Sequence, residues 1–365
     1  MANKKLYVDF HVLQTVPPSC VNRDDTGSPK TAVYGGKSRA RVSSQAWKRA
    51  MREMFRDELL AEEDVGKRTK RVKELIVKEI EAQNDTVDAS QLVDEAFKDE
   101  MFEKVGLSKD VLFFISDAQV KKVAELITEQ GKNKKEHGKA LKEALKEVLK
   151  EALKENPTID MALFGRMVAS EPGLNYDAAA QVAHSISTHA VQNEFDFFTA
   201  VDDCAPEDSS GAGHIGTTEY NSATLYRYAN INVCELAESL ENVSTAKAVR
   251  VFAEAFVRSM PTGKQNTFAN RTMPDAVYIT LREDQPVNLC GAFERAIPVS
   301  ANGYVEPSKK RLVEHAQCVC RDYIGAPLRS FTIGTGLEQL ETPTPMRTTL
   351  DLLESAVAEW LAERE

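Results

Sequence analysis

The spacing of apolar residues at the start of the chain predicts a strand followed by a hairpin. Residues 6–13 alternate between apolar and polar positions, which is the period of a half-buried strand. A loop rich in Pro, Ser and Asp follows over residues 17–29. Residues 31–34 and 37–42 then flank Gly35-Gly36, a two-residue connection suited to a tight turn. In the second arm, Arg39 and Arg41 are predicted to share one face, because strand side chains alternate.

Helical spacing begins at Ser43-Ser44, which can cap a helix that keeps Arg49 on its outer side. From about Glu62 to Asn156 the pattern is mainly helical and strongly charged, which predicts a helical subdomain inserted between strands. Its last helix, residues 140–155, has leucine at every fourth position and is expected to end at Asn156, since proline follows. The buried face of the first helix is predicted to comprise Trp47, Met51, Met54 and Phe55.

Further along the chain, the pattern predicts a protruding hairpin within a sheet domain. A loop-like stretch at residues 165–168 precedes a segment that we interpret as helical and that ends near Thr188-His189. Residues 195–201 alternate, and residues 204–213 are rich in Asp, Ser and Gly, which is typical of the tip of a long hairpin. The mixture of elements indicates an α+β class. Further strands are predicted at residues 225–233, 276–281 and 328–333, and further helices at residues 244–258 and 307–322.

Composition indicates a globular chain that can bury a sizeable core, since 42% of its 365 residues are hydrophobic. The sequence shows no apolar run of about 18 residues and no cleavable signal pattern, so a cytoplasmic location without membrane contact is expected. The six cysteines have no paired spacing and are expected to be free thiols. We expect no cofactor and no metal.

Charge is distributed unevenly along the chain. The net charge of −10 argues against a polyanionic partner, but residues 23–52 hold eight basic residues against Asp24 and Asp25, a net of +6. Such a surface can bind phosphate while distant acids keep the protein in solution, because the Debye length is about 8 Å at physiological salt. The basic residues are Arg23, Lys30, Lys37, Arg39, Arg41, Lys48, Arg49 and Arg52.

Three patterns suggest catalysis or metal binding, and each has a simpler explanation. The sequence Gly36-Lys37-Ser38 resembles the end of a phosphate-binding loop, but Thr31 stands where glycine is needed and a strand is predicted to follow. A cluster of one histidine and two cysteines lacks a fourth ligand at a suitable spacing, and it is expected to be structural. Two other histidines are expected to pack within the predicted helix. The cluster is His315, Cys318 and Cys320, and the packed pair is His184 and His189.

Asp24 and Asp25 leave two interpretations open. A carboxylate beside Arg23 could hold a metal for phosphodiester cleavage, or it could orient the arginine through a salt bridge. The second is favoured, because no other acidic cluster suggests a two-metal site. Tyr226 and Tyr228 are also ambiguous, since one strand face could stack bases or simply pack in the sheet. Lysines near residue 135 could contact duplex DNA or form a solvated face.

Several motifs together resemble those of a known family. The chain is similar to the backbone subunit of the type I-E CRISPR surveillance complex, Cascade, of the CasC or Cse-type family. The resemblance covers most of the chain, but the Lys/Glu repeat and the part after Arg271 depart from it. The motifs that carry it lie at residues 19–25, 34–37, 41–45, 48–52, 164–167, 198–203, 214–217, 226–232 and 263–265.

The resemblance implies a modified ferredoxin-like or RNA-recognition fold of the RAMP type, in which a palm carries helical fingers and a β-hairpin thumb. Copies are implied to stack along a guide RNA without catalysis, each thumb displacing one base so that the others pair with target DNA in antiviral defence. The implied partners are CRISPR RNA, the target DNA strand, further copies of the chain, the Cascade subunits that cap the filament and the processing endonuclease. The palm would be residues 1–61, 159–194 and 223–365, the fingers 62–158 and the thumb 195–222.

The resemblance also assigns residues to these roles. At guide phosphates it places Arg23, Ser43, Gln45, Lys48 and Arg52. It places Met167 beside the displaced base, and it places Phe198 and Ile215 in the thumb wedge with Thr199 beside it. The basic segment and the motif at 263–265 add Lys30, Lys37, Arg41, Arg49 and Lys264 as RNA contacts. Approximate equivalents of the lysines that touch DNA are Lys134, Lys135, Lys139 and Lys142.

Two other functions remain as alternatives. A guide-directed RNA endonuclease would use Asp24 or Asp25, because related backbone subunits of other CRISPR classes cut RNA with an acidic residue in a comparable loop. A cytosolic oligomeric scaffold would bind no nucleic acid. Metal-dependent cleavage assays and the RNA content of the natively purified protein separate these alternatives from a non-catalytic RNA-binding subunit.

Overall fold

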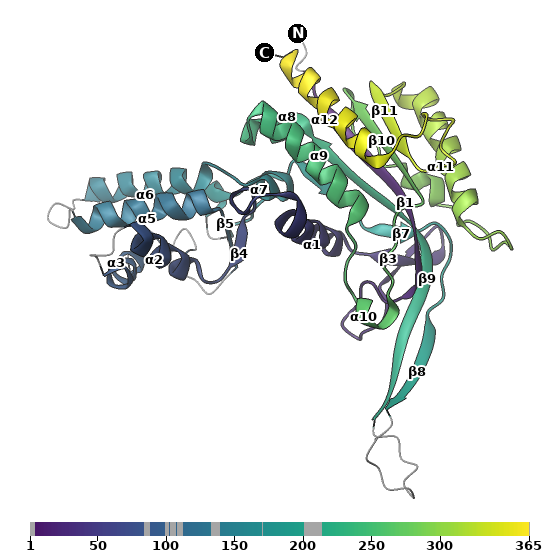
Figure 1. Cartoon of the computed structure of the whole chain (residues 1–365), viewed down its shortest axis with the longest axis horizontal. Coiled ribbons are helices and arrows are strands. Elements are labelled where there is room, and N and C mark those ends of the chain that lie inside the picture. Colours follow the sequence, from purple (N-terminus) through teal and green to yellow (C-terminus); the bar gives the residue numbers. More distant parts are fainter. Residues whose placement is uncertain are drawn as a thin grey trace, which may run out of the picture. The chain divides into compact units, whose positions relative to one another are not determined.

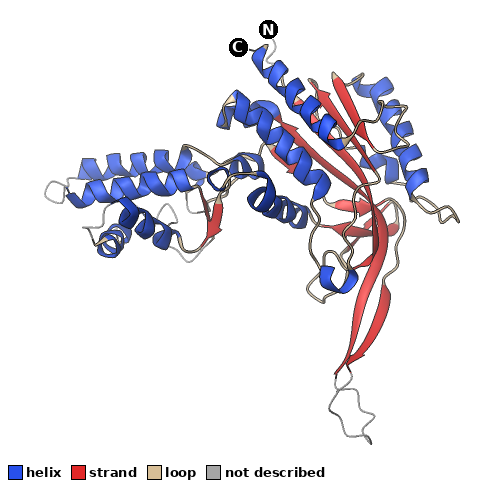
Figure 2. Ribbon diagram, in the orientation of Figure 1, coloured by secondary structure: helices blue, strands red, loops and turns tan. Residues whose placement is uncertain are grey.

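The computed structural model describes residues 4–83, 88–98, 102, 107, 112–132, 139–169, 171–200 and 214–364. These residues form two compact units, which are described separately. Unit 1 comprises Met1–Met54, Gln181–Cys234 and Val249–Glu365, and unit 2 comprises Phe55–Ala180 and Glu235–Ala248. Helices and antiparallel strands are mixed, which confirms the predicted α+β class (Figures 1 and 2).

Unit 1 is built on a twisted sheet with the strand order β11-β10-β1-β9-β7-β3-β2, and neighbouring strands along this order are antiparallel. The short strand β6 and the strand β8 also pair with β9. The strands are β1 (Tyr7–Ser19), β2 (Thr31–Tyr34), β3 (Lys37–Val42), β6 (Ala180–Val182), β7 (Ser185–Ser187), β8 (Glu194–Ala200), β9 (His214–Asn232), β10 (Ala276–Arg282) and β11 (Arg329–Ile333). The helices are α1 (Ser44–Met54), the C-terminal part of α9 (Asn242–Arg258), α10 (Gln265–Phe268), α11 (Val305–Val319) and α12 (Met346–Ala362), with the 3₁₀ turn η4 (Leu289–Phe293). Most of α8 (Val233–Ser239) and the N-terminal part of α9 belong to unit 2.

The central strand β1 has both of its faces buried, because helices cover the sheet on each side. Phe10 packs against Phe252 and Phe256 of α9, with ring centroids 5.3 and 6.1 Å apart. On the other face, the buried side chains of α11 and η4 form one apolar cluster with residues of β1, β9 and β10. Figure 1 shows α9 and α12 on one side of the sheet and α11 on the other. An alternating strand pattern therefore predicted β1 but not the cover over its polar face.

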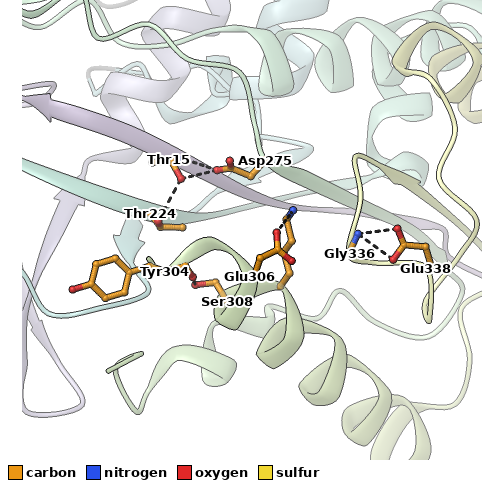
Figure 3. A network of polar contacts seen from close by, with 9 residues as sticks. Thr15, Thr224, Asp275, Tyr304, Glu306, Ser308, Gly336 and Glu338 are labelled. Carbon is orange, nitrogen blue, oxygen red and sulfur yellow. Dashed lines mark hydrogen bonds and ion pairs between the residues drawn. The ribbon is translucent and has the colours of Figure 1, made fainter. Parts of the chain in front are cut away.

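Polar side-chain contacts connect β1 to β9 and to the residue before β10 at Thr15. The carboxylate of Asp275 accepts hydrogen bonds from the backbone N–H and the hydroxyl of Thr15, at 2.6 and 2.8 Å, and Thr15 also contacts the hydroxyl of Thr224 on β9 at 3.4 Å (Figure 3). Asp275 precedes β10, so these bonds tie together three segments that are distant in sequence. The same view shows Glu338 accepting the backbone N–H of Gly336.

Unit 2 is mainly helical, as the charged periodic sequence predicted. Its core contains apolar residues of α2, α3, β5, α5 and the end of α6. The helix α6 ends just before Asn156, whose φ of 52° is left-handed, a conformation that terminates helices. The elements are β4 (Lys67–Thr69), α2 (Val72–Gln83), α3 (Ala89–Phe97), β5 (Phe113–Ile115), α5 (Asp117–Lys132), α6 (Lys139–Lys154) and α7 (Ile159–Phe164), with 3₁₀ turns η2 (Glu62–Asp64) and η3 (Pro172–Leu174).

The predicted helix ending near Thr188-His189 is wrong, because this stretch forms the short strands β6 and β7. Ser185 and Ser187 are fully buried, and the hydroxyl of Ser187 accepts the backbone N–H of Ala40 on β3 at 3.0 Å. The hydroxyl of Ser185 accepts the indole N–H of Trp47 at 3.0 Å. Two adjacent strands of three residues carry too few positions for their period to be recognised in the sequence.

Two further expectations can be compared with the described residues. No helix among them is long and apolar enough to span a membrane. The thiols of the described cysteines are free, and Cys204 lies outside the described residues.

Candidate nucleic-acid interface

The loop that carries Arg23 is held in shape by its own acidic residue. Oδ1 of Asp24 accepts the backbone N–H of Thr26 at 2.9 Å, the hydroxyl of Thr26 at 2.7 Å and the backbone N–H of Ser28 at 3.0 Å. The hydrogen bond from the Thr26 hydroxyl is the main reason that the pKa of Asp24 lies below its usual range. Asp24 thus organises the loop, a role that differs from both the metal ligand and the arginine partner considered from the sequence.

The loop is also attached to the start of α1. Oδ1 of Asn22 accepts the backbone N–H of Ser43 at 2.9 Å. The hydroxyl of Ser43 lies 3.4 Å from the backbone N of Ala46, and the backbone carbonyl of Ser43 accepts the N–H groups of Ala46 and Trp47. Ser43 is therefore the predicted cap of α1, and its side chain is buried rather than open to a ligand.

Helix α1 presents its basic residues away from its buried face. Trp47 and Met51 are buried, as predicted, while Arg49 is 81% exposed and forms an ion pair with Glu53 at 2.8 Å. Lys48 and Arg52 are four residues apart and therefore lie on the same side of the helix. The predicted contact Gln45 is exposed on the first turn.

The β2–β3 hairpin adds cations to the same unit. Gly35 and Gly36 have φ of 57° and 71°, the positive values that the predicted two-residue turn between the arms requires. Lys37 follows them at the exposed start of β3. The guanidinium of Arg41 donates to the backbone carbonyl of Thr31 at 3.1 Å and lies 3.1 Å from Nδ1 of His184. These contacts hold Arg41 at the surface beside the loop.

Arg39 does not belong to this surface. Its side chain is fully buried and donates to the carbonyls of Ser187, Phe293 and Glu294 at 2.8, 2.9 and 3.1 Å. The partners on η4 are about 250 residues away in sequence, so the pattern of the strand could not reveal them. With Arg39 removed from the count, the segment from Arg23 to Arg52 has seven accessible bases and two acids, a net of +5.

The base of the β8–β9 hairpin is bonded to this loop. The carboxylate of Glu219 on β9 accepts the hydroxyl of Ser28 at 2.9 Å and the side-chain amide of Asn193 at 3.1 Å. From the other side, the amine of Lys264 donates to the hydroxyl of Thr218 at 3.0 Å. Lys264, a predicted RNA contact, is therefore placed beside the hairpin, and its φ of 47° is left-handed.

The β8–β9 hairpin exposes apolar side chains on both of its faces. Phe198 pairs with Gly216, and Thr199 pairs with Ile215 in the next position of the ladder. Because neighbouring positions alternate, Phe198 points to one face and Ile215 to the other, although the two were assigned together to a wedge. Phe195 and Phe197 share the face of Ile215 and are 67% and 64% exposed. The sequence signal for this second aromatic pair was the same alternation that selected Phe198.

Met167 belongs to unit 2 and is 85% exposed. Its neighbours hold it in place: the buried guanidinium of Arg166 donates to the carbonyls of Leu153 and Leu174 at 2.7 and 2.9 Å, and the N–H of Val168 bonds to the side chain of Asn175. Burial lowers the pKa of Arg166 to about 10, so the group stays charged at neutral pH. The sequence analysis selected Met167 as an RNA contact, but it did not reveal that Arg166 holds this loop in place.

The predicted DNA contacts lie mostly beyond the description. Lys134 and Lys135 fall outside the described residues. Lys139 and Lys142 are in α6, but their side chains are also outside the description. Their contact with DNA stays a prediction.

The other candidate sites have structural roles. Tyr226 and Tyr228 are buried, and their hydroxyl groups contact Nδ1 of His11 and Oδ1 of Asp9 at 2.9 and 2.7 Å, so they pack in the sheet. The Gly36 motif is followed by strand β3. Cys318 contacts Asp322, and within the described part of the chain no group of three His, Cys, Asp or Glu side chains is arranged to hold a metal ion.

Comparison with known proteins identifies the family of this chain. A family model described as "CT1975-like protein" matches residues 8–358. The chain belongs to the CT1975-like protein family. A solved chain from a structure described as "CRISPR RNA-guided surveillance complex, pre-nicking" is 32% identical to this CT1975-like protein, with a TM-score of 0.79 and with 96% of this chain and 100% of that chain covered. Another, from a "CRISPR RNA-guided surveillance complex", is 29% identical, with a TM-score of 0.61 and coverage of 96% and 99%. No curated protein matches this CT1975-like chain.

Proposed function

We propose that this CT1975-like protein is a non-catalytic backbone subunit of a type I-E Cascade complex that binds CRISPR RNA. One observation carries the proposal. The basic surface formed by the Arg23 loop, β3 and α1 is joined within one unit to a hairpin that exposes aromatic side chains, through the bonds of Glu219 and Lys264. Cations bind the backbone of a nucleic acid regardless of sequence, and aromatic rings stack on or separate bases.

The comparisons and the sheet order support this assignment. Both similar solved chains come from RNA-guided surveillance complexes. In unit 1 the elements β1, α1, β7, β9, α9 and β10 occur in this chain order, and their strands lie in the order β10-β1-β9-β7. A ferredoxin-like βαββαβ palm would have the same chain order and strand order, which supports this part of the proposal. We propose that residues 62–158, which lie within unit 2, form the fingers and that the β8–β9 hairpin is the thumb.

Copies of the chain would then line the guide RNA, hold its phosphates and leave most bases free to pair with target DNA. The other Cascade subunits and the processing endonuclease would bind at the ends of this filament. Asp24 supports a non-catalytic role, because its Oδ1 already accepts three hydrogen bonds within its loop.

Replacing both Lys48 and Arg52 by alanine tests the proposal. RNA affinity should fall for every guide sequence, and the slope of log K against log salt should become less steep by about 1.4, since two phosphate contacts on a single strand are lost. The measurement is a fluorescence anisotropy titration at several salt concentrations.

The matched control replaces Lys310 and Arg321 by alanine, which removes the same charges from residues that are 79% and 72% exposed in and just after α11. This variant should keep the affinity and slope of the parent protein. Equal losses in both variants would show only an effect of net charge, and unchanged binding in the first would rule out the proposed surface.

A further inference from the structure

The ring of Phe198 occupies the space that a side chain on Gly216 would need. The two residues pair across the β8–β9 ladder, so they point to the same face. A Cβ atom built on Gly216 would lie 2.4 Å from Cζ of Phe198, and 2.9 and 3.0 Å from Cε1 and Cε2. The tip of the ring therefore lies against the backbone of β9. This contact agrees with an exposure of 42% for Phe198, lower than that of the other two phenylalanines of β8.

The backbone of Gly216 does not itself require glycine. Gly216 is the third residue of β9, within the β8–β9 ladder, and is not among the glycines with left-handed φ, so alanine fits its conformation. The atoms that alanine would meet are all at the far end of the Phe198 side chain. The ring tip would have to move from 2.4 Å to at least the 3.4 Å of ordinary contact, while the ladder stays in register.

We propose that Gly216 is the positioning residue for Phe198, which it places by leaving room for the ring against the strand. The inference rests on the proposed function, in which Phe198 touches the RNA and displaces a base. Gly216 acts only through Phe198. The missing side chain lets the ring lie at a fixed height above the hairpin, where its outer surface can contact a base. With alanine at 216, the ring stands about 1 Å further out and cannot take this position.

The test uses the full-length protein assembled on guide RNAs that each carry 2-aminopurine at one position, because this base fluoresces more strongly when it is unstacked. The wild-type protein should give bright signals at regularly spaced positions. Gly216→Ala should reduce these signals at least threefold, toward the level of Phe198→Ala, while RNA affinity changes less than about twofold. The double variant should match Phe198→Ala alone, since Gly216 acts through the ring. Thr217→Ala, on the opposite face of the same strand, should keep the wild-type signals.

The outcomes separate this inference from the proposed function. Regular bright positions that persist in Gly216→Ala overturn the inference and leave the function intact, as does a double variant that is weaker than Phe198→Ala. RNA binding without any regular bright position in the wild type overturns both. A measurement on the unaltered chain protects against misfolding of the variant: the α-proton resonances of Gly216 should lie upfield because of the ring current and should return to ordinary values in Phe198→Ala. No such shift would overturn the inference.

Discussion

The side-chain oxygen of Asn22 accepts the backbone N–H of Ser43 at 2.9 Å, so the loop that carries Arg23 is bonded to the residue that caps α1. This bond joins two groups of predicted phosphate contacts that are about 20 residues apart in sequence. Their relative position therefore depends on an uncharged side chain.

Replacing Asn22 by alanine should weaken RNA binding without changing its dependence on salt. The N–H of Ser43 loses its partner at a cost of about 1 to 2 kcal/mol, and the side chain at position 22 no longer bonds the loop to the start of α1. RNA affinity should fall roughly three- to tenfold, while the salt slope stays constant because no cation is lost. Anisotropy titrations measure both quantities. Asn302→Ala, at an exposed loop position, is the control, and a changed slope in Asn22→Ala would contradict this account.

Arg166→Lys should destabilise unit 2 by about 2 kcal/mol or more. The planar guanidinium donates to three backbone carbonyls, those of Phe114, Leu153 and Leu174, and a lysine ammonium cannot reach all three. Hydrogen exchange should become faster in α6 and η3 but not in β1 and β10 of unit 1. The control is Arg71→Lys, at a side chain that is 77% exposed. Unchanged protection of α6 would refute the structural role of Arg166.

The buried pair Asp9 and His11 predicts opposing effects of pH on stability. Burial raises the pKa of Asp9 to about 7 and lowers the pKa of His11 to about 3. Between about pH 4 and 7 the folded chain keeps the Asp9 proton that the unfolded chain has lost, so this contribution to stability decreases as pH rises. Between about pH 3 and 6.5 the unfolded chain binds a proton on His11 that the folded chain does not, so that contribution increases as pH rises.

Asp9→Asn should remove the first effect and expose the second. The free energy of unfolding of the variant, relative to wild type, should rise with pH between about 4 and 7 by on the order of 1 kcal/mol per unit. Denaturant unfolding at four pH values in this window measures the difference. A flat difference would mean that Asp9 is ionised in the folded protein.

The protein should not cleave RNA paired with its guide. Incubation with guide, complementary RNA and Mg²⁺ should give no discrete products, because Oδ1 of Asp24 is already engaged in hydrogen bonds within its loop. Asp25→Ala should behave like the wild type in this assay, which is followed on denaturing gels. Discrete products that disappear in Asp25→Ala would establish an endonuclease instead.

The sequence predicted those elements whose hydrophobic period, turn residues or cap residue lie within the element itself. The alternation in β1, the two glycines of the β2–β3 turn and the serine cap of α1 each depend on residues within one element, and the structure confirms all three. The strands β6 and β7 were missed because three residues do not establish a period, and their buried polar residues belong to contacts with other elements.

The candidate site was less predictable, because its geometry depends on distant residues. Alternation along β3 predicts that Arg39 and Arg41 share a face, but Arg39 is buried, where it donates to the carbonyl of Phe293 in η4, whereas Arg41 donates to Thr31 on the neighbouring strand β2. The identity of a residue as arginine does not indicate whether distant backbone carbonyls will bind its guanidinium. Likewise, Phe198 could be selected from the sequence, whereas its contact with Gly216 depends on the register between β8 and β9, which local spacing does not give.

The second arm of the hairpin and a central strand of the sheet, which the sequence suggested as separate elements, are one strand of 19 residues, β9. At about 3.3 Å per residue it extends for roughly 60 Å, and no loop interrupts it. A rotation of only a few degrees at the sheet end would move its far end by several ångströms. The hairpin therefore has no hinge of its own in this arm. The distance between its exposed aromatic rings and the sheet is set by the length of a single strand.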